Sequence, residues 1–128
     1  VVSLDVKKDF LGNYNIYTHS GTRKADPDLL TTIRRHQDNG AGEILINSID
    51  RDGTMNGYEI ELIRRTSSVA LVPMVACGGA GNIEHLKNAI MAGASVVAAG
   101  SMFWFQGVHK AVLISYPKYE ELEKISND

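Results

Sequence analysis

Short apolar runs alternate with segments of helical pattern four times along this chain, and this alternation constrains the fold more than any other feature. The runs that predict strands are 1–6, 43–49, 70–76 and 95–99, and the segments that predict helices are 26–39, 59–66, 82–91 and the stretch from Pro117 onward. Strands of almost continuous apolar character, separated by helices, form parallel sheets with right-handed crossovers. The sequence therefore predicts an α/β fold with the order β-(hairpin)-α-β-α-β-α-β-α.

Chain length limits how many such units are present. Four βα units account for the 128 residues, whereas a closed barrel of eight units needs about 250. We therefore expect one domain, residues 1–128, built as a (βα)4 half of a TIM barrel. The chain begins with Val1 and not with Met, and we expect a fragment or an evolutionary half of something longer. The competing architecture is a flavodoxin-like monomer with the four strands in an open sheet.

Local signals add detail to this order. The pair Gly12-Asn13 predicts a small β-hairpin after the first strand, with the apolar residues on either side of the pair as its two arms. Asp26 is the expected N-cap of the first helix, and Pro27 is its expected first residue. Asn82 is the expected N-cap of the third helix.

Composition and charge exclude several broad classes of protein. The formal net charge is −2 at pH 7, which argues against a general nucleic-acid-binding protein, because such domains carry clustered basic charge. The longest apolar stretch, residues 69–77, is far shorter than the roughly 20 residues that cross a membrane. Cys77 is the only cysteine, so no internal disulfide forms, which fits a reducing, cytoplasmic location. Neither a metal-ligand spacing nor a dinucleotide or nucleotide fingerprint is present, and we expect no metal and no cofactor.

Polar and glycine residues cluster where the predicted strands end. In parallel α/β folds, functional groups gather at the C-terminal ends of the strands. The residues at these ends are Asp5 and Lys7 after the first strand, Asn47, Ser48, Asp50, Asp52, Gly53 and Thr54 after the second, Gly78, Gly79 and Gly81 after the third, and Gly100 and Ser101 after the fourth. We therefore predict a site at this edge of the sheet.

Two of these clusters indicate a phosphate site. Gly78-Gly79-Ala80-Gly81 leads into the third helix, and Gly100-Ser101 precedes residues 102–105, which can form one helical turn. Glycines let backbone N–H groups approach an oxyanion, and loops after adjacent barrel strands form phosphate sites in this way. We predict one bound phosphate at Gly78, Gly79, Gly81, Gly100 and Ser101. The alternative is that the glycines only make tight turns.

Asp5 is the candidate general acid or base, because it is a carboxylate at the mouth of a mainly apolar strand. The alternative is a carboxylate that caps a helix or pins a loop. Asp50 and Asp52, on either side of Arg51, are either its partners or members of a loop ion pair. Cys77 is more typical of a small strand-end residue than of a nucleophile, because no histidine stands near it in a patterned way.

These residues also carry a resemblance to a known enzyme family. Residues 40–58 are similar to the signature of the cyclase subunit of imidazole glycerol phosphate synthase. Residues 76–81 and 98–103 resemble its phosphate-binding loops, and residues 1–7 resemble its fifth barrel strand. The similarity covers almost the whole chain, but only the C-terminal half of the family's (βα)8 barrel.

The resemblance implies an activity and a set of roles. The family enzyme receives ammonia from a glutaminase partner and cleaves and cyclises a phosphorylated ribonucleotide derivative, with two aspartates on opposite halves as acid and base. It implies that Asp5 is one of this pair, that Asp52 is a further aspartate of the active-site loop, and that Glu43 belongs to a charged ring through which ammonia enters. The residues implied to surround the substrate are Lys7, Asn47, Ser48, Asp50, Gly53 and Thr54.

The second aspartate of the pair belongs to the other half of the barrel. We therefore expect very low or no cyclase activity from the isolated chain. We also expect it to pair, either as a homodimer or with a separate N-terminal half-barrel.

Three residues depart from the cyclase pattern. Asn47 stands where the cyclase usually has Thr, Cys77 where it has Ser, and Trp104 where His is expected. These departures are more similar to a paralogous branch that accompanies sugar amidotransferases in surface-polysaccharide pathways, where the barrel delivers ammonia. A phosphate-binding half-barrel without turnover is a further alternative.

Overall fold

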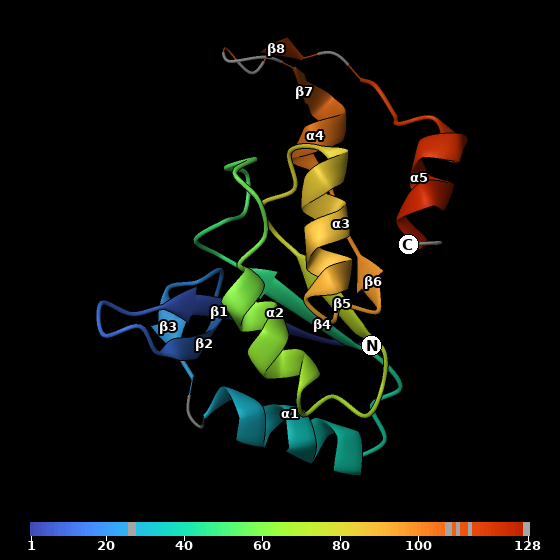
Figure 1. The fold of residues 1–128 in the computed structure, drawn as a ribbon. Coiled ribbons are helices and arrows are strands. Elements are labelled where there is room, and N and C mark those ends of the chain that lie inside the picture. The colour runs from blue at the N-terminus through green and yellow to red at the C-terminus, as the bar shows by residue number, and fades with distance from the viewer. Residues whose placement is uncertain (26–27, 107–108, 110, 113, 127–128) are drawn as a thin grey trace.

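The computed structural model describes residues 1–25, 28–106, 109, 111–112 and 114–126. A six-stranded sheet runs through it (Figure 1), with the strands in the order β3-β2-β1-β4-β5-β6. Their bounds are Val2–Lys8 (β1), Tyr14–Thr18 (β2), Arg23–Lys24 (β3), Ile44–Ser48 (β4), Met74–Cys77 (β5) and Val96–Val97 (β6). The other described elements are Leu29–Asp38 (α1), Ile60–Ser67 (α2), Ile83–Met91 (α3), Ser101–Trp104 (α4), Tyr119–Ser126 (α5) and a small hairpin of Phe105–Gln106 (β7) and Ala111–Val112 (β8).

The four central strands are parallel, and each lies beside the next one along the chain. β1 pairs with β4, β4 with β5 and β5 with β6, and α1, α2 and α3 make the three connections in turn. Right-handed crossovers that always advance in the same direction place every connecting helix on the same face of the sheet. A flavodoxin-like sheet doubles back and carries helices on both faces. That alternative is therefore wrong, and the predicted (βα)4 arrangement of a half-barrel is confirmed.

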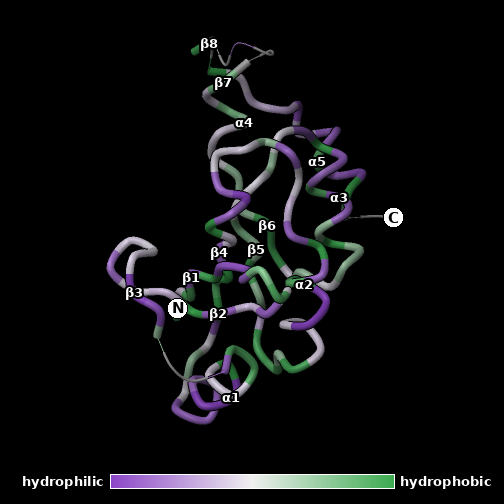
Figure 2. Tube along the Cα trace, turned by 90° about the vertical axis from the view of Figure 1, so that its left-hand side faces the viewer, coloured by the Kyte–Doolittle hydropathy of each residue, from purple (hydrophilic) through white to green (hydrophobic). Residues whose placement is uncertain are grey.

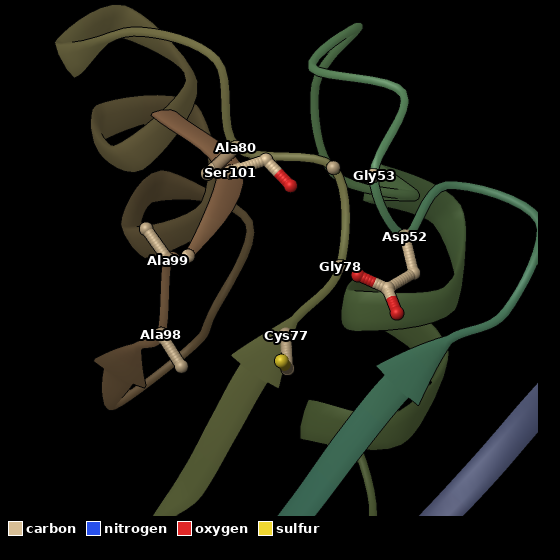
Figure 3. Close-up of a pocket in the computed structure, with 10 residues that line it drawn as sticks. Asp52, Gly53, Cys77, Gly78, Ala80, Ala98, Ala99 and Ser101 are labelled. Atoms are coloured by element: carbon tan, nitrogen blue, oxygen red, sulfur yellow. The ribbon is translucent and has the colours of Figure 1, made fainter. Parts of the chain in front are cut away.

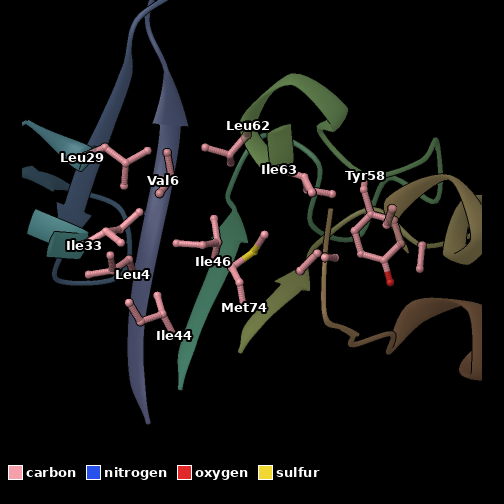
Figure 4. Packing of buried hydrophobic residues seen from close by; sticks show 14 of the residues in the cluster. Leu4, Val6, Leu29, Ile33, Ile44, Ile46, Tyr58, Leu62, Ile63 and Met74 are labelled. Atoms are coloured by element: carbon pink, nitrogen blue, oxygen red, sulfur yellow. The ribbon is translucent and has the colours of Figure 1, made fainter. Parts of the chain in front are cut away.

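The helical face of the sheet carries the hydrophobic core (Figure 4). Val6, Ile44, Ile46 and Met74 of the strands are each at most 2% exposed. They belong to one cluster with buried residues of the three connecting helices, namely Leu29, Ile33, Leu62, Ile63 and Leu86. Figure 2 shows the same concentration of hydrophobic residues in the central strands. Burial of these side chains holds the strand ends in place.

The opposite face of the sheet is lined by the alternate strand positions, because successive side chains of a strand point to opposite faces. One row across β1, β4 and β5 consists of Asp5, Asn47 and Cys77. The next row, towards the start of the strands, consists of Ser3, Leu45, Val75 and Val96. Val96 is 45% exposed, and this face corresponds to the interior of a complete barrel.

A hairpin follows the first strand as predicted, but its arms differ from the prediction. β2 pairs antiparallel with residues 5–8 of β1, so β1 is itself the first arm. Phe10 and Leu11, which were expected in an arm, lie at the exposed tip. The Asp9 carboxylate accepts hydrogen bonds from the backbone N–H groups of Leu11 and Asn13, and these bonds close the turn before a longer arm can form.

The starts of the helices agree with the sequence in one case and differ in another. Asn82 caps α3 as predicted, because its side chain accepts a hydrogen bond from the backbone N–H three residues later at 2.9 Å. The cap of α1 is Asp28, whose carboxylate accepts the equivalent hydrogen bond at 3.0 Å. The prediction that Asp26 is this cap is wrong, and Asp26 and Pro27 lie outside the described residues. Within the described part of the chain, none of the helices is long and apolar enough to cross a membrane.

Candidate functional site

The strand ends bring three side chains together at one edge of the sheet. Asp5 lies opposite Asn47, and Asn47 lies opposite Cys77. The side-chain amide of Asn47 donates a hydrogen bond to Oδ1 of Asp5 at 3.0 Å. The amide oxygen of Asn47 is buried and accepts no hydrogen bond from the described residues. The hydrogen bond holds the Asp5 carboxylate beside Asn47 on the open face of the sheet.

A pocket of about 230 Å³ lies at the same edge (Figure 3). Its lining comes from three successive strand ends, and the lining residues are Asp52 and Gly53 after β4, residues 77–80 after β5, and residues 98–101 after β6. In Figure 3, Asp52 and Ala99 lie on opposite sides of the pocket, with Cys77 between them. The structure therefore brings Asp52, Gly53, Gly78, Gly79, Gly100 and Ser101 into one pocket. Gly81 lies outside it and lines an adjacent hollow with Asn82.

The glycines in and beside this pocket are not all required for the same structural reason. A Cβ at Gly79 would overlap the carbonyl oxygen of Gly57, and a Cβ at Gly81 would overlap that of Met55. The backbone N–H of Gly57 also donates a hydrogen bond to the carbonyl oxygen of Gly79 at 2.8 Å. Packing against the loop of residues 50–57 therefore requires Gly79 and Gly81. Gly100 differs, because a Cβ there would meet no atom within 4 Å.

The loop of residues 50–57 is held by its own polar groups. Asp50 accepts a hydrogen bond from the backbone N–H of Lys8 at 2.8 Å, which ties the loop to the end of β1. The backbone N–H of Asp52 donates to the carbonyl oxygen of Ser48 at 2.9 Å. The hydroxyl of Thr54 donates to the carbonyl oxygen of Arg51 at 2.8 Å. Asp50 and Thr54, which the sequence placed around a substrate, thus have structural partners, whereas Asp52 lines the pocket.

Three other predicted site residues lie away from the pocket. Ser48 is buried with 4% exposure, on the helical side of the sheet. Lys7 is exposed on the open face, two residues after Asp5 along β1. Glu43 directly precedes β4 and is therefore at the opposite end of the sheet. Its position excludes contact with the pocket.

Cys77 is poorly suited to act as a nucleophile. Burial raises the pKa of its thiol, the negative charges of Asp52 and Asp5 raise it further, and the backbone N–H of Gly78 only partly offsets them. Because the thiolate is the nucleophilic form, this environment suppresses reactivity. Among the residues that the structure describes, no three His, Cys, Asp or Glu side chains are grouped to hold a metal ion.

Tyr58 supports the pocket, although sequence reasoning gave it no role. Its side chain is 4% exposed, and its hydroxyl donates a hydrogen bond to the carbonyl oxygen of Ala98 at 2.7 Å. This bond joins the segment just before α2 to Ala98, which follows β6 and belongs to the pocket wall. The only sequence signal was an aromatic residue with a polar tip next to a loop glycine.

Comparisons with known proteins place the chain in a family. The family described as "Histidine biosynthesis protein" matches residues 1–109. The chain is 47% identical to a Leptospira borgpetersenii protein named as a candidate imidazole glycerol phosphate synthase subunit HisF, over 98% of this chain and 50% of that protein. It is 42% identical to the similarly named subunit hisF2 of Pseudomonas aeruginosa, over 96% and 49%. It is 45% identical to imidazole glycerol phosphate synthase subunit HisF of Chlorobaculum parvum, over 83% and 42%.

The matches show how much of each relative the chain covers. The chain spans about half the length of the curated relatives that it matches, in agreement with a fold of four βα units. The family match covers β1 to β7, and so includes every strand end that lines the pocket. The chain belongs to the histidine biosynthesis protein family, as a half related to subunit HisF of imidazole glycerol phosphate synthase.

Proposed function

We propose that the pocket binds the phosphate group of a small-molecule substrate. The observation that carries this proposal is the convergence of two glycine-containing loops, residues 77–80 and 98–101, on one cavity at the C-terminal edge of a parallel sheet. Backbone N–H groups of such loops and a hydroxyl such as that of Ser101 are good donors to phosphate oxygens. A ligand bound here would have its reacting part over the row of Asp5, Asn47 and Cys77.

The reaction proposed for the completed site is the ammonia-dependent cyclase and lyase step implied by the sequence resemblance, and the relatives are named as subunits of imidazole glycerol phosphate synthase. General acid and base catalysis needs two groups in different protonation states on either side of the substrate. Asp5 supplies one, oriented by the amide of Asn47, and Asp52 lines the same pocket edge. The second group of the pair comes from another half-barrel, because the open face of the sheet has no opposite wall within the described residues.

Ammonia would reach this site from a glutaminase subunit at the other end of the sheet. Glu43 stands at that end, just before β4. The partner that completes the barrel is a second copy or an N-terminal half-barrel, and either would cover the rows of the open face.

Binding of inorganic phosphate tests the first step of this proposal. We expect phosphate to raise the midpoint of thermal unfolding of the 128-residue chain above that in chloride of equal ionic strength. Ser101→Ala and Gly100→Leu should remove most of this protection. Gly42→Leu is the matched control. A Cβ at Gly42 would also meet no atom within 4 Å, and Gly42 precedes β4, at the end of the sheet opposite the pocket. If phosphate does not protect the parent chain, the phosphate proposal is wrong.

Turnover tests the second step. With ammonia and the substrate of the relatives, the isolated chain should give very low or no product, and Asp5→Asn should remove whatever remains. Turnover by the isolated chain near that of a full-length relative would contradict the proposal, as would residual turnover that Asp5→Asn leaves unchanged.

A second candidate function is delivery of ammonia to a sugar amidotransferase. Asn47 and Cys77 occupy the central row where the cyclase pattern has Thr and Ser, and relatives include proteins named hisF2 and hisF3. A chain that is paired with a complementary half and binds phosphate, yet forms no imidazole product, would favour this function over the cyclase.

A further inference from the structure

Glu59 breaks a local rule at the start of α2. It is the N-cap residue of this helix, but its side chain makes no capping hydrogen bond. Asn, Asp, Ser and Thr are preferred there because their short side chains reach the first free N–H groups of the helix. Violations of such local rules concentrate at residues that have another task.

The Glu59 carboxylate instead collects three partners from three other segments. The hydroxyl of Tyr14, in β2, donates a hydrogen bond to Oε1 at 2.9 Å. Nζ of Lys8, at the end of β1, lies 3.8 Å from the same oxygen. Nε of Arg51, in the loop of residues 50–57, donates to Oε2 at 3.3 Å. The Glu59 side chain is only 15% exposed, so the group is partly removed from water and these contacts are screened less than surface pairs.

Two of these partners also contact the pocket loops. Arg51 directly precedes Asp52. A Cβ placed on Gly79 would lie 3.0 Å from the Cβ of Arg51, so Arg51 packs closely against the glycine loop. Lys8 donates its backbone N–H to Asp50 at 2.8 Å while its side chain reaches Glu59. The Glu59 carboxylate therefore joins the hairpin, the start of α2 and the rim of the pocket through one half-buried group.

We infer that Glu59 is a positioning residue that fixes the loop of residues 50–57, and with it Asp52, against the glycine loop of the pocket. The part of this inference that concerns ligand binding rests on the proposed phosphate site. The part that concerns loop order does not.

Amide hydrogen exchange of the 128-residue chain tests the inference with Glu59→Gln, which keeps the shape and removes the charge. We expect the N–H groups of Asp52 and Gly57 to exchange about tenfold faster, because both are hydrogen-bonded within the loop contacts. The N–H of Ile46, in the core of β4, should keep its rate. Equal acceleration of all three amides would indicate a general loss of stability and would overturn the inference, as would unchanged loop amides.

Glu61→Gln is the matched control. It removes the same charge from the same helix, but Glu61 is exposed and forms its ion pair with Arg65, at 2.8 Å. Loop exchange should stay within about twofold of the parent chain, because exposed pairs contribute little. If Glu59→Gln does not fold, Tyr14→Phe removes one hydrogen bond to the same carboxylate and should accelerate the same loop amides by a smaller factor.

Phosphate affinity separates this inference from the proposed function. If the parent chain binds phosphate, Glu59→Gln should weaken binding severalfold and Glu61→Gln should not. If the parent chain binds none, the proposed phosphate site fails, and the exchange comparison alone decides the positioning role of Glu59.

Discussion

Gly79 has a packing reason that is independent of any ligand. Its φ is +108°, and a Cβ there would overlap the carbonyl oxygen of Gly57. Loss of affinity in a Gly79 variant would therefore not by itself demonstrate a phosphate contact. At this position the two explanations weighed from the sequence, a tight turn and a ligand contact, are compatible.

We predict that Gly79→Ala destabilises the chain by at least about 1–3 kcal/mol, the cost of a side chain in a sparsely populated backbone region. Gly100→Ala should change stability by less than about 0.5 kcal/mol, as at an ordinary surface position. Urea unfolding followed by circular dichroism measures both free energies. Equal effects of the two substitutions would contradict the packing analysis.

Cys77 provides a test of the electrostatics at the pocket. The pKa of its thiol is raised by burial and by the charges of Asp52 and Asp5, so less thiolate is present near pH 8 than for a free cysteine. We predict slow alkylation by iodoacetamide in the folded chain and a faster reaction in Asp52→Asn, because a negative charge is removed. Mass spectrometry of the alkylated chain follows the rate. A slower or unchanged reaction in Asp52→Asn would contradict the effect of the Asp52 charge on this thiol.

At the scale of elements, helix α3 depends on its cap. Asn82 accepts the backbone N–H of His85 at 2.9 Å, so Asn82→Ala should cost about 1 kcal/mol. Asn88→Ala is the control within the same helix. It lies on an exposed position, where alanine is the better helix former, and should be neutral or slightly stabilising. Thermal unfolding of both variants measures the difference, and equal midpoints would argue against the capping role.

The elements and the site differ in how far they could be predicted from sequence. The parallel arrangement of the central strands could be predicted from four apolar runs separated by helices, because such runs are typical of strands that are buried in a parallel sheet. The predicted cap of α1 was wrong because the cap is Asp28, a residue of the same type two positions after the predicted Asp26. The predicted arms of the hairpin were wrong because hydrogen bonds to the Asp9 side chain close the turn early. Both errors concern choices among adjacent residues with similar propensities.

The site was predictable where it obeys the strand-end rule and not where it depends on contacts between distant segments. Asp52 and Gly53 line the pocket because they follow β4 directly. Tyr58 and Glu59 act through partners about 40 and 45 positions away, at Ala98 and Tyr14. No local pattern in the sequence reports such partners.

At the scale of the whole molecule, the open face of the sheet should drive association. Leu45, Val75 and Val96 form an apolar row on this face, in which Val96 is 45% exposed and Val75 is 6% exposed. We predict that the purified chain forms dimers and that Val96→Lys shifts it towards monomer. Met91→Lys is the control, because Met91 is 76% exposed at the end of α3 and away from this row. Light scattering decides the matter, and a parent chain of 14.0 kDa in solution would rule out the dimer.

The pairing of β2 with β1 has a consequence for how far such association can proceed. Exposed strand edges recruit further strands without limit, which is the route to aggregation. Here β2 occupies the edge of β1 along residues 5–8 and leaves only its first residues unpaired on that side. The outermost strands of the sheet, β3 and β6, have only two residues each, so neither margin offers a long template for a growing fibril.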